Sequence, residues 1–193
     1  HRDLHLSLRR QRQMCIRDSV AGSMGDLGCF SFFPSKNMAV GGEGGMLTTT
    51  VEELTDAVSL VVNHGRSPSL ESMQLGSNLR MSEVSAAIGT VQLKHLDNWV
   101  ARRRAIAQQY NDAFADLTLV ATPKTRPGAK HAWHQYCLTT KYPDQLVKHM
   151  DSHEIDARIY YPTPCHKQAV FANHPQHNET LPITDKLSKS NYY

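Results

Sequence analysis

The sequence predicts an α/β fold, in which strands and amphipathic helices alternate along 193 residues. Three observations predict it. The apolar run Cys29–Phe33 has high strand propensity and ends at Pro34, which cannot continue a strand ladder. Apolar residues recur at helical spacing in Val51–Val62 and again from Glu83 onward. Beyond Asp116 short strands and turns prevail, as is typical of an α+β region.

The composition is that of a globular protein. An apolar content of 40% is enough for a core, and no segment approaches the roughly 20 apolar residues that cross a bilayer. No segment has the layout of a signal peptide. Four cysteines without paired spacing predict reduced thiols, and a net charge of +3 indicates no particular partner. We therefore expect a cytoplasmic protein that binds neither nucleic acid nor a membrane.

The first nineteen residues look foreign to the rest of the chain. They are rich in arginine, contain neither glycine nor proline, and from Arg9 to Ser19 resemble translated sequencing-adapter read-through. A basic arm for nucleic acid is the alternative, but no aromatic residue is present to stack on bases. Residues 1–19 are therefore expected to be a non-native leader.

Lys36 has the most chemical interest, because it follows the end of the first expected strand. A lysine amine becomes a nucleophile when burial or a cationic neighbour makes its proton easy to lose. The hydroxyl groups of Ser31 and Ser35 can donate to phosphate oxygens, and the glycines between Gly41 and Gly45 let the backbone approach a bound group. Together these features indicate a lysine that binds a cofactor.

Two other interpretations of this stretch compete with that one. A nucleotide-binding phosphate loop places its glycines before the lysine and a serine or threonine directly after it, whereas here the glycines follow and the next residue is Asn37. A surface lysine beside a glycine turn is the usual state of an arbitrary lysine. The residue types alone leave the cofactor lysine and the surface lysine open.

Residues 25–38 read Gly-Asp-Leu-Gly-Cys-Phe-Ser-Phe-Phe-Pro-Ser-Lys-Asn-Met, and residues 42–49 read Gly-Glu-Gly-Gly-Met-Leu-Thr-Thr. This string resembles the lysine segment of the DegT/DnrJ/StrS-type nucleotide-sugar aminotransferases, fold-type I enzymes that use pyridoxal 5'-phosphate (PLP). The resemblance implies that Lys36 is the Schiff-base lysine, which also moves the proton, and that Ser31 contacts the PLP phosphate. Relatives that act as sugar dehydratases have histidine at the lysine position, so Lys36 favours transamination.

A second motif occupies residues 76–83, which read Gly-Ser-Asn-Leu-Arg-Met-Ser-Glu. It resembles the family's Gly-x-Asn-Tyr-Arg-Met-Ser-Glu, with Leu79 in place of tyrosine. In the family the asparagine, and often the arginine, reach the PLP phosphate of the partner subunit. The resemblance implies that Asn78 and Arg80 bind cofactor across a homodimer interface, and a guanidinium fork suits phosphate oxygens. Ser82 is also the expected N-cap of the next helix.

Two histidines are expected near the substrate on the same resemblance. His64 lies in the turn that closes Val51–Val62, which resembles the family's His-Gly-Arg turn, although a helix C-cap explains it as well. His166 ends Tyr-Tyr-Pro-Thr-Pro-Cys-His, which resembles His-Tyr-Pro-x-Pro-x-His with Tyr160 replacing the first histidine. Both are candidates to bind the sugar.

The remaining elements are expected from local patterns. Gly89, in the helix from Glu83, permits close packing against another backbone, and residues 102–104, three arginines, are expected on a solvated helix face. The further expected elements are a strand over Met46–Thr50, a helical run that includes Ile106, Tyr110, Phe114 and Leu117, a strand over Trp133–Thr140, a helix over Asp144–Ser152 and a strand over Ile155–Tyr161.

No metal site is expected. His131 and His134 form a close pair, but on the strand expected there an odd spacing puts them on opposite faces. No cysteine or carboxylate spacing completes a ligand set. Cys165 and His166 are adjacent in sequence and therefore point apart, which disfavours a thiol nucleophile with its base.

The resemblance implies the C-terminal part of the fold-type I large domain plus an α+β small domain. Residues 20–100 would be the rest of the large domain, 101–118 a bridging helix, and 119–193 a truncated small domain. The family's aspartate for the pyridine nitrogen and its ring-stacking aromatic residue lie upstream of the lysine and are not in this sequence. The expected reaction passes an amino group from glutamate to a nucleotide-linked keto-sugar; the alternatives are a catalytically incomplete fragment and a PLP-family sugar dehydratase.

Overall fold

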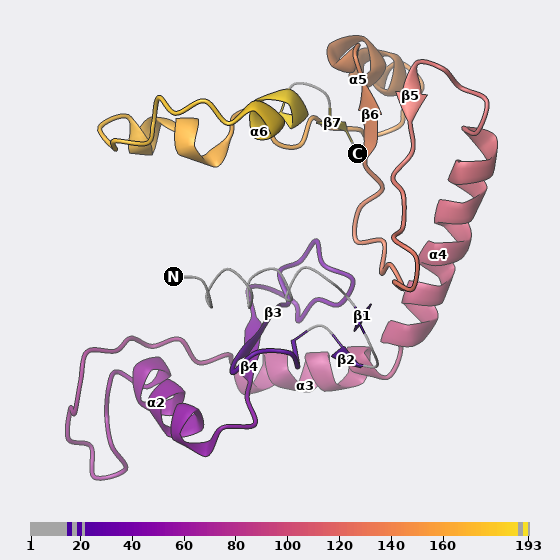
Figure 1. Cartoon of the computed structure of the whole chain (residues 1–193). Helices are drawn as coiled ribbons and strands as arrows, with labels where there is room; N and C mark the ends of the chain where they lie inside the picture. The colour runs from indigo at the N-terminus through magenta and orange to yellow at the C-terminus, as the bar shows by residue number, and fades with distance from the viewer. Residues whose placement is uncertain (1–14, 17–18, 21, 189–190, 193) are drawn as a thin grey trace. The chain divides into compact units, whose positions relative to one another are not determined.

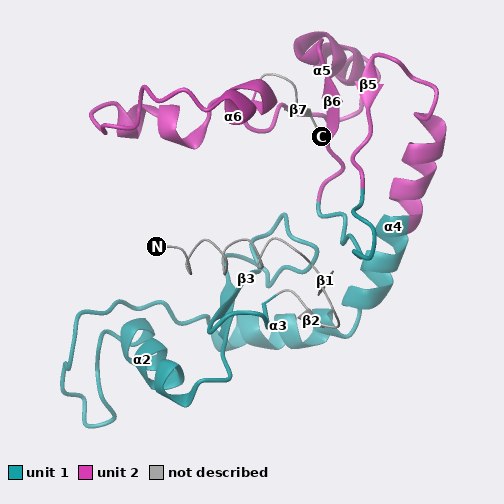
Figure 2. Ribbon diagram, viewed as in Figure 1, with its two compact units in different colours: residues 1–104, 125–134 teal, residues 105–124, 135–193 magenta. Residues whose placement is uncertain are grey.

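The structure is a computed structural model that describes residues 15–16, 19–20, 22–188 and 191–192. Most of the expected leader, residues 1–19, lies outside the described residues. The chain divides into two compact units (Figures 1 and 2), unit 1 with residues 1–104 and 125–134 and unit 2 with residues 105–124 and 135–193. None of the helices in the described part of the chain is long and apolar enough to cross a membrane.

Unit 1 combines two antiparallel strand pairs with helices. Strand β1 pairs with β2, and β3 pairs with β4. Helix α4 extends beyond unit 1 and also supplies residues of unit 2. The elements are β1 (Cys15–Ile16), β2 (Ser19–Val20), β3 (Gly28–Ser31), β4 (Gly45–Thr48), α2 (Glu52–Val62), α3 (Glu83–Leu93) and α4 (Leu96–Ala113). The helices expected in this part of the sequence are confirmed, although α4 ends at Ala113, before Phe114 and Leu117 of the expected run.

The β3–β4 pair fixes where the Lys36 loop leaves the sheet. Gly28 lies opposite Thr48 and Ser31 lies opposite Gly45, so residues 32–44 leave and re-enter at one end of the pair. The backbone N–H of Phe32 donates to the Gly44 carbonyl over 2.8 Å and continues the pairing by one hydrogen bond. The strand expected over Cys29–Phe33 is therefore confirmed in place, although it ends at Ser31.

Val40 is the centre of the small core of unit 1. Its side chain is fully buried, and a Cβ atom built on Gly89 of α3 would lie 3.1 Å from Val40 Cγ1. Gly89 thus permits the expected close packing, although its neighbour is a side chain and not another backbone. The N–H of Ala39 donates to Gln92 Oε1 over 3.2 Å. These contacts attach residues 39 and 40, which follow Lys36 in the loop, to helix α3.

Unit 2 contains an antiparallel sheet of order β5-β6-β7 and short helices. The Tyr136 hydroxyl donates to Asn111 Oδ1 over 2.7 Å, and the Tyr136 ring packs against that of Tyr110. The elements are β5 (Val120–Ala121), β6 (Leu138–Thr140), α5 (Pro143–Asp151), the 3₁₀ helices η1 (Cys165–Lys167) and η2 (Ala169–Phe171), α6 (Pro182–Leu187) and β7 (Asn191–Tyr192).

Two expected strands are wrong or shorter than predicted. Of Trp133–Thr140 only β6 forms a strand, because Trp133 has a left-handed backbone with φ of +48°, which a strand cannot contain. Ile155–Tyr161 forms no strand, and only Ile159 occupies a bridge position. The N–H of Ile155 donates back to the Met150 carbonyl over 3.0 Å and so closes the end of α5 instead of a strand ladder.

Candidate functional site

Lys36 is the last residue of a hydrogen-bonded turn, residues 33–36, which we call the Lys36 turn. The N–H of Lys36 donates to the Phe33 carbonyl over 2.8 Å, and Pro34 within the turn cannot donate to a strand neighbour. The Lys36 side chain is half-buried. The end of β3 and this turn therefore present the lysine from a fixed backbone.

Both residues that flank Lys36 are hydrogen-bonded to one distant stretch, residues 131–134, which we call the His131–His134 segment. Asn37 Nδ2 donates to the Ala132 carbonyl over 2.8 Å. On the other side of Lys36, His134 Nε2 lies 3.0 Å from the Ser35 carbonyl oxygen, so the Nε2–H form of the imidazole donates to it. The sequence predicted a strand for His131 and His134. They lie instead in an irregular segment whose hydrogen bonds hold the two neighbours of Lys36.

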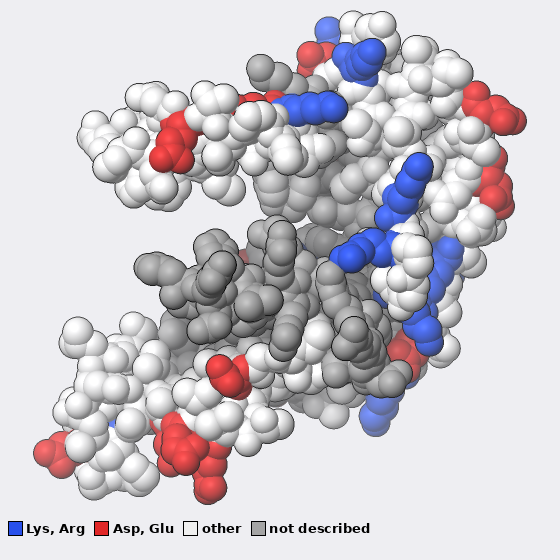
Figure 3. Space-filling view, viewed as in Figure 1, with Lys and Arg blue, Asp and Glu red and all other residues white. Residues whose placement is uncertain are grey.

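Helix α4 holds the His131–His134 segment in turn. Arg103 Nη1 donates to the carbonyls of Trp133 and His134 over 3.1 and 3.4 Å, and Arg104 Nε donates to the His131 carbonyl over 2.9 Å. Figure 3 shows basic side chains gathered along α4. The expected solvated face agrees with the exposure of Arg102 and Arg104, whereas Arg103 is half-buried. The sequence did not reveal that Arg103 and Arg104 also donate to backbone carbonyls. Carbonyls outside a sheet ladder still need donors, and a guanidinium offers several in a fixed geometry.

Burial and positive charge favour the neutral form of both histidines in this segment. Burial lowers the pKa of His134, the Lys36 charge lowers it further, and Arg103 adds a smaller effect in the same direction. The hydrogen bond to Ser35 opposes this shift. Burial and then the Arg104 charge lower the pKa of His131, whose Nδ1 accepts the Trp133 N–H over 2.8 Å. Lys36 is thus close enough to affect the protonation of His134.

Asn78 and Arg80 line an open groove of about 790 Å³ between the β3–β4 pair, α2 and residues 78–81. The groove lining includes Glu43 and the apolar side chains of Phe30 and Leu79, but neither Ser31 nor Lys36. The structure therefore brings Asn78 and Arg80 together in a groove that Lys36 does not line.

The turn that contains His64 packs beside the segment of Asn78 and Arg80. An Arg80 guanidinium nitrogen donates to Asn63 Oδ1, and the His64 N–H donates to the Ser77 carbonyl over 3.1 Å. His64 itself is exposed and has a left-handed φ of +60°. Its placement in the turn that ends α2 agrees with the expected C-cap.

Ser31 is exposed at the end of β3. Its Oγ accepts the Phe33 N–H over 3.4 Å, so its own hydroxyl hydrogen can donate to a further group. A Cβ atom built on Gly42, in the same loop as Lys36, would meet no atom within 4 Å. An amine and a hydroxyl donor are the groups that the carbonyl and phosphate ends of PLP require, so the chemistry of Lys36 and Ser31 fits that group.

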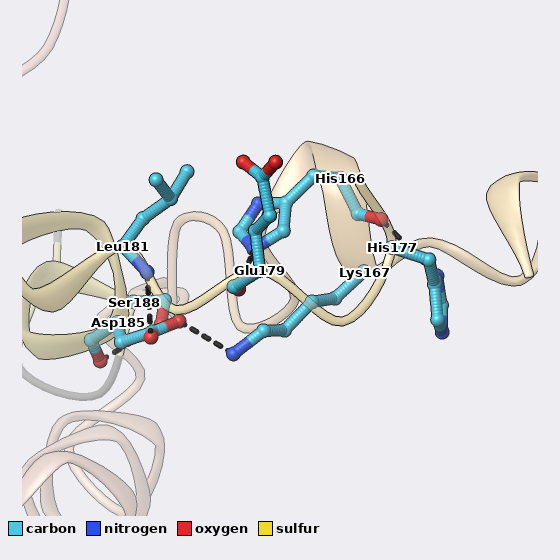
Figure 4. A network of polar contacts seen from close by, with 7 residues as sticks. All are labelled: His166, Lys167, His177, Glu179, Leu181, Asp185 and Ser188. Atoms are coloured by element: carbon cyan, nitrogen blue, oxygen red, sulfur yellow. Dashed lines mark hydrogen bonds and ion pairs between the residues drawn. The ribbon is translucent and has the colours of Figure 1, made fainter. Parts of the chain in front are cut away.

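His166 lies in unit 2, within a polar network shown in Figure 4. His166 Nε2 lies 3.2 Å from the Glu179 carbonyl oxygen, and the His166 carbonyl lies 3.1 Å from His177 Nδ1. Lys167 Nζ donates to Asp185 Oδ1 over 2.7 Å. This hydrogen bond from Lys167 is the main cause of a lowered pKa at Asp185. Sequence patterns did not reveal this network, because its members are joined through backbone carbonyls and a single ion pair.

The residues that sequence reasoning missed are those that hold Lys36, namely Asn37, Arg103 and His134. The one available signal was the close pair His131 and His134, which the sequence placed on an expected strand. Within the described part of the chain, no three histidine, cysteine or carboxylate side chains come together as metal ligands.

Comparison with known proteins matches nearly the whole chain to one protein family. The profile of the DegT/DnrJ/EryC1/StrS aminotransferase family matches residues 14–192. The erythromycin biosynthesis sensory transduction protein EryC1 of Saccharopolyspora erythraea is 33% identical over 172 residues, which are 89% of this chain and 47% of that protein. The dTDP-3-amino-3,4,6-trideoxy-alpha-D-glucose transaminase of Streptomyces venezuelae is 31% identical over 168 residues, which are 87% of this chain and 44% of the transaminase.

Solved structures agree with this result. The crystal structure of S. venezuelae DesV in complex with a ketimine intermediate superposes with a TM-score of 0.84 at 30% sequence identity and covers 90% of this chain and 47% of DesV. The chain thus spans about half the length of the relatives it matches. The match of the family profile over nearly the whole sequence shows that the chain belongs to the DegT/DnrJ/EryC1/StrS aminotransferase family.

Proposed function

We propose that the chain is part of a cytoplasmic PLP-dependent aminotransferase that passes an amino group from glutamate to a nucleotide-linked keto-sugar. One observation carries the proposal: Lys36 is half-buried on a turn whose two flanking residues are each hydrogen-bonded to the His131–His134 segment. A lysine that must reach one atom of a cofactor needs such a fixed backbone. The S. venezuelae relative, named as a dTDP-amino-sugar transaminase, supports the substrate class.

The chemistry divides between the cofactor and the side chains. PLP, when bound, supplies an electron sink for the carbanion formed at the reacting carbon. Lys36 Nζ would hold the cofactor and then move the proton to and from that carbon. The Ser31 hydroxyl would donate to the cofactor phosphate.

Asn78 and Arg80 are proposed to serve the cofactor of a second copy of the chain. They line a groove that Lys36 does not line, and the Arg80 guanidinium is exposed there. A fork of donors on an open surface suits a phosphate brought by another subunit. We therefore propose a homodimer, with His64 and His166 as sugar-binding residues.

The test is reduction with borohydride after incubation of the purified chain with PLP, followed by peptide mass mapping. An adduct confined to Lys36 is the expected result. The Lys36→Arg variant keeps the charge but cannot form the adduct, and the exposed Lys124 and Lys130 report non-specific labelling. If Lys36 stays unmodified, or if label spreads evenly over the exposed lysines, the chain does not bind PLP and the incomplete-fragment alternative holds.

A further inference from the structure

The hydrogen bond between His134 and the Lys36 turn suggests a role for a histidine that has none in the proposed reaction. We propose that His134 is a positioning residue for Lys36, which fixes the direction of the lysine amine by holding the Ser35 carbonyl. The inference rests on the proposed function of Lys36. His134 touches neither cofactor nor substrate in this role, because it acts through the backbone of the residue before the lysine.

The geometry of the two flanking hydrogen bonds supports this role. A turn held at one point can still rotate about that point, whereas Ser35 and Asn37 fix the backbone on both sides of Lys36. The hydrogen bonds come from different parts of the segment, one from the carbonyl of Ala132 and one from the imidazole of His134. Removal of the imidazole would leave only the Asn37 contact.

The His131–His134 segment is rigid enough to act as a support. Trp133 is 8% exposed, and its ring lies with its centroid 4.2 Å from that of His131. Its left-handed φ of +48° is stabilised by the His131 Nδ1 contact and by Arg103. A residue held in this uncommon conformation persists only where its surroundings determine it. The contacts of Trp133 therefore fix the backbone from which His134 follows.

The charge of Lys36 also acts on His134, in addition to the hydrogen bond that joins His134 to the Lys36 turn. Lys36 and Arg103 are the two cations that act on the imidazole, and both favour its neutral form. Because such coupling is reciprocal, loss of the Lys36 charge makes His134 bind a proton more readily. The pKa of His134 therefore reports whether the imidazole stays close to the lysine.

The first experiment measures reactivity at Lys36 in His134→Ala and His134→Gln. The readouts are the PLP adduct trapped by borohydride and the rate of acetylation by dilute acetic anhydride, both quantified by peptide mapping. Loss of one hydrogen bond, worth about 0.5–1.5 kcal/mol, predicts an about two- to tenfold fall at Lys36 in His134→Ala. In His134→Gln the glutamine amide can donate to the Ser35 carbonyl, so labelling of Lys36 should return to near that of the unmodified chain.

His153→Ala is the matched control, since His153 is exposed on unit 2 and should leave Lys36 labelling unchanged. Label at Lys124 should not change in any variant. If His134→Ala labels Lys36 like the unmodified chain, the positioning role is wrong. Circular dichroism and a thermal melt show whether His134→Ala folds; if it does not, His134→Gln and the next experiment decide.

The second experiment follows the imidazole protons of His134 and His131 by NMR against pH, with Lys36→Gln as the variant. The pKa of His134 should rise toward the ordinary value of 6.5, because a cation near it has gone, and the pKa of His131 should not move. Arg104→Gln should give the opposite result, a shift at His131 only. An unchanged pKa of His134 in Lys36→Gln would overturn the coupling.

The outcomes separate this inference from the proposed function. If PLP never labels Lys36 but acetylation still falls in His134→Ala, the cofactor proposal fails and the positioning role stands. If PLP labels Lys36 equally in all the His134 variants, the function stands and the positioning role fails.

Discussion

Asn37 Nδ2 donates a hydrogen bond over 2.8 Å to the carbonyl oxygen of Ala132, a residue 95 positions further along the chain. The other amide atom, Asn37 Oδ1, is buried and finds no partner among the described residues. The residue after Lys36 therefore contributes one long-range contact while carrying one unsatisfied oxygen. A substitution here removes both at once.

Asn37→Ala should lower the free energy of unfolding by about 1 kcal/mol or less, because loss of the hydrogen bond is partly offset by loss of the unsatisfied oxygen. A denaturant titration measures this value. The more specific readout is amide hydrogen exchange of residues 131–134, which should become faster. Asn173→Ala, at an exposed position, is the control. Unchanged exchange in Asn37→Ala would show that the contact does not hold the segment.

Val40→Ala should destabilise unit 1 by about 1–3 kcal/mol, because a fully buried side chain is replaced by a cavity. Gly89→Ala places a methyl carbon 3.1 Å from Val40 Cγ1, which is closer than an ordinary contact. In the double variant this methyl fills part of the cavity. Thermal and denaturant unfolding of the four proteins should therefore give a total loss smaller than the sum of the single losses. Simple additivity would contradict the proposed packing of Val40 on α3.

Unit 2 should lose stability at acid pH through Asp185. The pKa of this carboxyl is lowered, chiefly by the hydrogen bond from Lys167, so the folded state favours the charged form. Its contribution is fully present above the ordinary value of 3.8 and disappears as pH falls through the lower folded value. Asp185→Asn should flatten the fall in melting temperature below about pH 4, whereas Asp116→Asn, an exposed control, should not. Identical acid profiles would refute the assignment.

The cysteines should differ in their rates of alkylation. Burial raises the pKa of the Cys137 thiol, which lowers its thiolate fraction and also restricts access. Cys29 and Cys165 are exposed. Iodoacetamide at neutral pH, followed by peptide mapping over time, should therefore modify these two before Cys137. In urea the three rates should converge, and a fast Cys137 in the folded protein would contradict its burial.

Mixing two inactive variants tests whether Asn78 and Arg80 act across a dimer. A Lys36→Ala chain cannot form the adduct, and an Asn78→Ala, Arg80→Ala chain should bind PLP weakly. In a mixed dimer the chain with Asn78→Ala and Arg80→Ala still has Lys36. The Lys36→Ala chain supplies it with intact Asn78 and Arg80 side chains. Borohydride-trapped label on that second chain should rise when the two are mixed. If label does not rise although light scattering shows dimers, both residues serve the lysine of their own chain.

The helices were predictable because apolar residues recur at helical spacing and because their ends carry local signals. Ser82 illustrates the second reason, since its Oγ accepts the Ser85 N–H over 3.1 Å, as expected of an N-cap. The strand expected over Ile155–Tyr161 was wrong for a complementary reason. Strand propensity measures how well residues fit beside a neighbour, and here the backbone turns back to α5 instead.

The position of Lys36 was predictable because its whole surrounding string is local in sequence. The hydrogen bonds that hold the Lys36 turn were not predictable, because side chains donate them to backbone carbonyls many residues away. Arg103 reaches a carbonyl 30 positions distant. Such a contact leaves no periodic pattern, and the left-handed backbone of Trp133 that exposes the carbonyl cannot be inferred from a bulky aromatic residue.

The β3–β4 register has a consequence for the order of folding. Closing the stretch between Ser31 and Gly45 costs little chain entropy, because few residues separate the paired strands. The contacts of Ser35 and Asn37 with residues almost a hundred positions away must close a far longer loop. The hairpin can therefore form early, while the direction of Lys36 is settled late. A nascent chain would acquire its lysine loop well before the distant contacts of Ser35 and Asn37 fix that loop in place.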